Sequence, residues 1–145
     1  MQQMDFDNTL GRYIGQLNTA LSMALNQELQ RAKVDVTSEQ FRLLTHLWKE
    51  DGLSQIILAE RTGRDRGSIT RMLDILENKG FTVRVADKND RRINNIYLTK
   101  KGQSIQSSAV SCAQVVLSKI TEGFSESERK ELHQLLKKAS ENFER

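Results

Sequence analysis

The apolar residues change their spacing near the middle of the chain, and this change constrains the possible folds more than any other sequence feature. Up to residue 79 they recur every three or four positions, which predicts amphipathic helices. After Gly80 they alternate with polar residues, which predicts a strand containing Phe81, Val83 and Val85. A second alternating run at residues 95–98 follows the charged segment 87–92. The two runs therefore predict a β-hairpin with a charged tip.

The rest of the chain predicts four helices before the hairpin and two after it. Two capping boxes mark helix starts, namely Thr37 with Gln40 and Ser125 with Glu128. The expected helices cover residues 7–31, 37–50, 55–62, 65–79, 99–120 and 125–143, without an intervening proline, repeat or low-complexity run. This order predicts a mainly helical α+β fold in a single domain, residues 1–145.

The residue content excludes several classes of protein. Cys112 is the single cysteine, so no intramolecular disulfide can form and we expect a reducing, cytoplasmic compartment. It lies on an apolar stripe, which favours packing over redox chemistry. His46 and His133 lack metal-ligand spacing, and no catalytic motif is present. We therefore expect no enzyme activity, metal or cofactor. The sequence also shows neither a signal peptide nor a long apolar run, so we expect no association with a membrane.

The charge distribution favours a polyanionic partner for the centre of the chain. Residues 54–102 carry a net charge of +5, while the remainder carries −2. A basic centre between mildly acidic ends is typical of a nucleic-acid-binding module attached to a scaffold.

The basic segment also contains a helix, a tight glycine turn and a second helix, followed by the hairpin. In the second helix Ile69, Met72, Leu73 and Leu76 form an inner face, while the outer face carries Arg66, Ser68, Thr70 and Arg71. A helix with one face held and polar side chains on the other can enter the major groove of DNA. Arg91 and Arg92 at the hairpin tip can enter the narrower minor groove. The pattern predicts a winged helix-turn-helix.

Several motifs in this segment resemble those of the MarR family of transcription regulators. The motifs are Leu58-Ala59-Glu60, the run from Ser68 to Leu73, the run from Leu76 to Phe81, Arg84, Asp90-Arg91-Arg92, and Leu98-Thr99-Lys100-Lys101-Gly102. The resemblance covers residues 38–102 most clearly, and it implies a DNA-binding lobe there, flanked by dimerisation helices at residues 5–31 and 103–145. It further implies a homodimer that binds a pseudo-palindromic double-stranded DNA operator, usually as a repressor released by a small phenolic or anionic inducer.

The resemblance also implies a set of DNA-contacting residues. Arg66, Ser68, Thr70 and Arg71 would meet the major groove, while Arg92 would enter the minor groove from a wing that Asp90 holds. The further candidates are Arg84 and Arg91 in the wing, with Ser38 and Gln55 as possible phosphate contacts at helix starts. Gly67 departs from the pattern, because a glycine has no side chain with which to read a base. Tyr13, His46 and Trp48 are candidates for an inducer pocket, with core packing as the alternative.

Two other functions are compatible with a winged helix. A protein-interaction module without DNA binding would not need arginine at both the second helix and the wing tip. An RNA-binding module would need aromatic side chains for base stacking near the basic residues, and none is found there.

Overall fold

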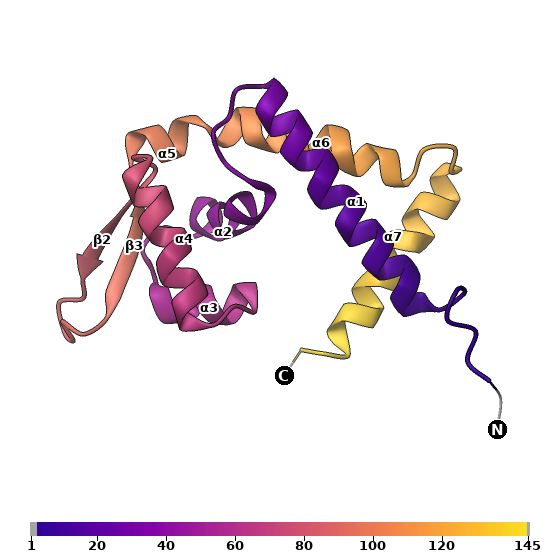
Figure 1. Cartoon of the computed structure of the whole chain (residues 1–145), viewed down its shortest axis with the longest axis horizontal. Helices are drawn as coiled ribbons and strands as arrows, with labels where there is room; N and C mark the ends of the chain where they lie inside the picture. Colours follow the sequence, from indigo (N-terminus) through magenta and orange to yellow (C-terminus); the bar gives the residue numbers. More distant parts are fainter. Residues whose placement is uncertain (1–2, 145) are drawn as a thin grey trace.

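The computed structural model describes residues 3–144 and shows a winged-helix lobe joined to helices from both ends of the chain (Figure 1). The lobe contains α2 (Ser38–Lys49), β1 (Leu53–Ser54), α3 (Gln55–Thr62), α4 (Arg66–Asn78), β2 (Thr82–Ala86), β3 (Asn94–Leu98) and α5 (Lys100–Ser104). The end helices are α1 (Leu10–Arg31), α6 (Gln106–Ile120) and α7 (Glu126–Glu141). Helix α1 packs against α6, and both lie to one side of the lobe (Figure 1). The expected α+β class and the order of the helices and the hairpin are confirmed.

Helix starts follow the capping residues read from the sequence. Both capping boxes form, at Thr37 with Gln40 and at Ser125 with Glu128. Asp65 caps α4 by accepting the backbone N–H of Ser68 at 2.7 Å. Helix α1 begins at Leu10 instead of residue 7, because the Thr9 side chain accepts the N–H of Arg12.

The helix expected at residues 99–120 is divided into α5 and α6 at Ile105. The indole N–H of Trp48 donates to the carbonyl of Gly102 at 3.0 Å. In a continuous helix, this carbonyl would accept the N–H of residue 106. Gly102 is also buried against the carbonyl of Phe81, where a side chain would collide with the backbone. Contacts from α2 and from the residue before β2 therefore set the break.

The hairpin belongs to a three-stranded antiparallel sheet in the order β1-β3-β2. Leu53 pairs with Ile96 in β3, and Thr82 pairs with Leu98 across the hairpin. The sequence prediction missed β1, because two residues are too few to show an alternating pattern.

Buried apolar residues are concentrated in the lobe and at its junction with α1 and α6. The inner face of α4 lies in one continuous core with Leu44, Leu58 and Phe81. By contrast, α7 has no buried residue, and the first half of α1 exposes Leu10, Ile14 and Leu17. Among residues 3–144, no helix is both long and apolar enough to cross a bilayer.

Candidate nucleic-acid interface

Helix α4 presents a polar outer face that its buried inner face holds in place. Ile69 and Leu76 are fully buried, whereas Arg66, Thr70 and Arg71 on other faces are exposed. The Arg66 and Arg71 guanidinium groups have no hydrogen-bond or ion-pair partner within residues 3–144. Both cations therefore remain available to an anionic partner.

The wing tip is ordered by two carboxylates. Asp87 accepts the backbone N–H groups of Asn89 and Asp90 and the side-chain amide of Asn95, at 2.9–3.1 Å. Asp90 accepts the backbone N–H and the guanidinium of Arg92. The Asn95 amide and the two backbone N–H groups lower the pKa of Asp87, and the Arg92 guanidinium lowers the pKa of Asp90. Both carboxylates therefore stay charged at neutral pH and hold the loop that carries Arg92.

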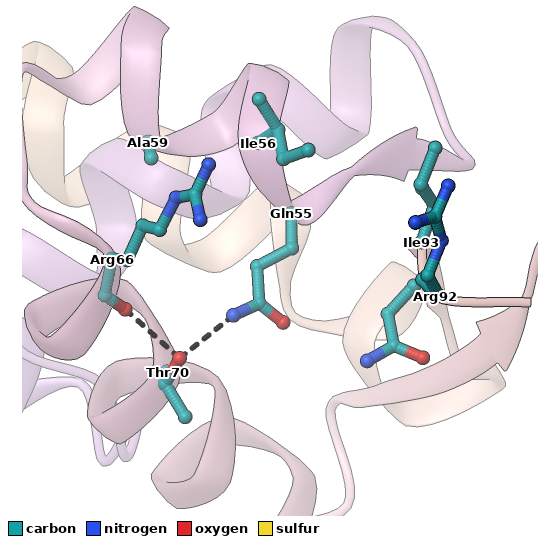
Figure 2. A pocket seen from close by; sticks show the side chains of 8 residues that line it. Gln55, Ile56, Ala59, Arg66, Thr70, Arg92 and Ile93 are labelled. Atoms are coloured by element: carbon teal, nitrogen blue, oxygen red, sulfur yellow. Dashed lines mark hydrogen bonds between the residues drawn. The ribbon is translucent and has the colours of Figure 1, made fainter.

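A hollow of about 220 Å³ lies between α4, the start of α3 and the wing (Figure 2). Arg66 and Arg92 line it together with Gln55 and Thr70, and Asn94 of β3 contributes another polar group. Gln55 donates from its side-chain nitrogen to the Thr70 hydroxyl at 2.8 Å. Residues from three separate segments of the sequence are thus brought together around one basic concavity.

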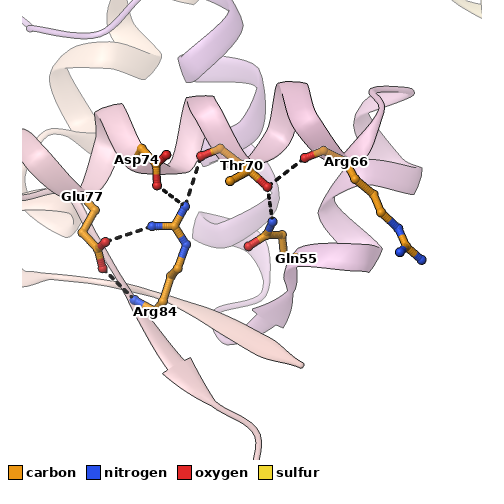
Figure 3. A network of polar contacts seen from close by, with 6 residues as sticks. All are labelled: Gln55, Arg66, Thr70, Asp74, Glu77 and Arg84. Carbon is orange, nitrogen blue, oxygen red and sulfur yellow. Dashed lines mark hydrogen bonds and ion pairs between the residues drawn. The ribbon is translucent and has the colours of Figure 1, made fainter. Parts of the chain in front are cut away.

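Arg84 in β2 connects the wing to α4 (Figure 3). Its guanidinium donates to Asp74 at 2.8 Å, to Glu77 at 2.9 Å and to the backbone carbonyl of Thr70 at 3.1 Å. The Arg84 side chain is only 18% exposed. These contacts give Arg84 an internal role as a clamp, which differs from the DNA contact expected from its sequence position.

The other expected site residues fall into two groups. Arg91 is exposed at the wing tip, and the Ser68 hydroxyl accepts from Arg64 at 3.1 Å beside the outer face of α4. Ser38, in contrast, is only 5% exposed, and its backbone N–H donates to Asn26 of α1. Ser38 lies in the wall of a cavity between α1, α2 and α6 and not in that of the hollow lined by Arg66 and Arg92, so the structure does not bring it to this surface.

Sequence reasoning missed the residues that support the interface from behind. Arg64 bridges Ser68 and Glu39, with a 2.8 Å ion pair to the latter. Asp74 and Glu77, the two acceptors of Arg84, are three residues apart and so share one face of α4. That spacing was a usable signal for a basic partner, although it does not say which arginine fills the role.

Replacing Arg84 with methionine should lower the free energy of unfolding by about 1–3 kcal/mol, because three acceptors lose a charged donor. The loss of unfolding free energy should lie toward the lower end of this range, because water can reach the Asp74 and Glu77 carboxylates once Arg84 is removed. Arg92→Met is the matched control, because its side chain is 90% exposed and such surface pairs add little stability. Urea unfolding at one protein concentration measures both variants. Equal stability losses would contradict the clamp.

Comparisons with known proteins agree with this geometry. A family model described as the MarR family matches residues 36–93. An uncharacterized HTH-type transcriptional regulator of Bacillus cereus is 32% identical over 145 residues, covering 96% of this chain and 95% of the relative. A MarR transcriptional regulator from Methanosarcina mazei has a similar structure, with a TM-score of 0.86, 26% identity, and coverage of 92% of this chain and 94% of that one.

A mutant MarR from Escherichia coli, solved in complex with operator DNA, is also similar. Its TM-score is 0.80 at 30% identity, and the match covers 90% of this chain and 92% of the other. The resemblance seen in the sequence motifs is therefore confirmed by both the family model and the solved structures. This chain belongs to the MarR family of winged helix-turn-helix transcription regulators, whose members are not enzymes.

Proposed function

We propose that this protein is a repressor that binds an inverted-repeat operator as a homodimer and is released by a small ligand. The observation that carries the DNA-binding part is the basic concavity shared by α4 and the wing, where Arg66 and Arg92 line one hollow. Helix α4 would enter the major groove with Arg66, Ser68, Thr70 and Arg71 toward the bases. Arg92, with Arg91 beside it, would enter the adjacent minor groove, where a narrow width increases the negative potential.

The positive charge of the lobe supports DNA as the partner, since residues 54–102 carry a net charge of +5. A protein that neutralises several DNA phosphates releases their counterions, and its binding to DNA therefore depends strongly on salt. In the complex of the Escherichia coli MarR, the same fold is held on operator DNA. The helix dipole of α4 adds a partial positive charge beside Arg66, which also favours a nearby phosphate.

The apolar surface of the end helices supports a homodimer. Ile14 and Leu17 on α1 are 58% and 47% exposed, and Leu135 and Leu136 on α7 are 56% and 54% exposed. Burying this surface against a second copy would remove it from water and would relate the two α4 helices by a two-fold axis, as an inverted-repeat operator requires. Two half-sites separated by about 34–36 Å, one turn of DNA, would match such a pair.

A second cavity of about 220 Å³ supports release by a ligand. It lies between α1, α2 and α6, with walls that include Leu21, Leu25, Phe41 and Leu117, and with Arg42 as its cation. Such a site suits a small aromatic molecule that carries one anionic group. Tyr13, His46 and Trp48, the candidates from the sequence, do not line this cavity. A ligand there would change how the lobe sits on α1 and α6, and so the spacing of the two α4 helices.

Operator binding should weaken by orders of magnitude between about 50 and 200 mM salt. Arg92→Ala should weaken all operator variants by a similar factor, with the largest loss where A·T pairs narrow the minor groove, because the Arg92 side chain responds to groove width and potential and not to a base pattern. Arg66→Ala should instead cost roughly 1–3 kcal/mol and relax the preference at particular positions. Duplex selection followed by titration in one buffer measures these effects. A folded protein that selects no duplex would instead favour a protein-interaction module.

Sedimentation equilibrium at micromolar concentration should give twice the chain mass of 16.6 kDa, and the unfolding midpoint should rise with protein concentration. Ile14→Glu should disrupt the dimer, because it places a charge in the apolar interface. Gln27→Glu makes the same charge change at another exposed position of α1 and should leave the dimer intact. A stable, folded wild-type monomer would contradict the homodimer.

Small aromatic carboxylates, with benzoate as the first probe, should weaken operator binding. Arg42→Gln should reduce the effect of benzoate more than that of uncharged benzyl alcohol, because it removes the cation of the cavity. Filling the cavity by Ala113→Leu should remove both effects while leaving operator affinity unchanged. If no member of a panel of aromatic acids weakens operator binding, the release mechanism is wrong.

A further inference from the structure

The Thr70 hydroxyl makes two hydrogen bonds inside the protein, although Thr70 is exposed on α4. Its oxygen accepts from the Gln55 amide nitrogen at 2.8 Å and donates to the carbonyl of Arg66 at 2.9 Å (Figures 2 and 3). A carbonyl can only accept, so the single hydroxyl hydrogen must point to Arg66. The hydroxyl therefore has no hydrogen left to donate to a base.

The orientation of the Gln55 amide follows from the same pair of bonds. Because the hydroxyl hydrogen is used on Arg66, only the nitrogen end of the amide can face Thr70. The amide oxygen of Gln55 is buried without a hydrogen-bond partner among the described residues. Gln55 is thus held against α4 by its bond to Thr70, and both residues line the hollow.

The backbone of Thr70 is held as well. Its carbonyl accepts from the Arg84 guanidinium at 3.1 Å, which connects this residue to the wing strand. A β-branched side chain has few rotamers in a helix, and two hydrogen bonds select one of them. Figure 2 shows the hydroxyl toward Gln55 and Arg66, with the rest of the side chain turned away from both. The γ-methyl group and one lone pair of the hydroxyl are consequently left for a partner. Of these, only the methyl group suits thymine, which presents an acceptor and a methyl group in the major groove.

We infer that Thr70 reads the operator through its methyl group, as a contact to the 5-methyl of a thymine, and that Gln55 is the positioning residue that holds the side chain in this orientation. The inference rests on the proposed operator binding. Thymine is the only base that presents an apolar group in the major groove, so a threonine methyl selects it without a hydrogen bond. Gln55 acts in this account from within the protein and not as a phosphate contact.

The test begins with the operator obtained by duplex selection with the full-length wild-type protein. Each thymine is then replaced by deoxyuridine, which removes only the 5-methyl group. At one position in each half-site, the replacement should lower wild-type affinity about fourfold, the value of one buried methyl-sized group. Thr70→Val keeps a methyl group and should retain this sensitivity. Thr70→Ser removes the methyl group and should lose it.

Gln55→Ala provides a separate readout of the positioning role. It removes one of the two hydrogen bonds that fix the Thr70 rotamer, so the methyl group is held less firmly against the thymine. Deoxyuridine at the thymine position should therefore lower the affinity of this variant less than that of the wild type, a change that a loss of stability alone would not produce. Circular dichroism and affinity for a random duplex serve as controls for folding and for general binding.

The possible failures are distinguishable. If the wild type selects no duplex, the proposed function fails and the inference fails with it. If the wild type selects an operator but no deoxyuridine position lowers its affinity, the inference alone is wrong. Full wild-type sensitivity to deoxyuridine in Thr70→Ser or in Gln55→Ala would also overturn it.

Discussion

Burial of one face of α4 is the constraint on which the rest of this structure depends. Ile69, Met72, Leu73 and Leu76 lie in the core, with at most 7% of any of them exposed. Turning the helix about its axis would expose this face to water, at a cost of several kcal/mol. The outer residues are therefore fixed in direction before any DNA arrives. The wing is oriented relative to α4 by Arg84, so both parts of the interface derive from the same packing.

The winged-helix lobe and the end helices differ in how much of their apolar surface is buried within the chain. Most of the core lies in the lobe and continues to Leu29 of α1 and Cys112 of α6, whereas α7 buries nothing. The exposed apolar side chains of α1 and α7 are the surface that the proposed homodimer would bury. The cavity at Phe41 and Leu117 lies where these two parts meet. In the homodimer that we propose, a change at that junction would move the lobe relative to the end helices.

Local signals in the sequence predicted most of the secondary structure. Side-chain caps such as Asp65 and Ser125 act within three residues, so their effect is visible without any tertiary information. The failures came from contacts over long sequence distances. The break at Ile105 depends on the indole of Trp48, 54 residues before the carbonyl that it binds. Strand β1 exists only because Leu53 and Ser54 pair with β3.

The sequence by itself determined the order of the elements, the inner and outer faces of α4, the charged wing tip and the family, because periodicity, caps and motifs are local. The tertiary structure decided what the polar side chains do. It engaged Arg84 with Asp74 and Glu77, buried Ser38 against α1, and committed the Thr70 hydroxyl to Gln55 and Arg66. Folding chooses the partners of donors and acceptors from distant segments, and a hydrogen bond requires close approach and good alignment. The spacing of residues along the sequence does not show which groups from separate elements come close together, or how those groups are aligned.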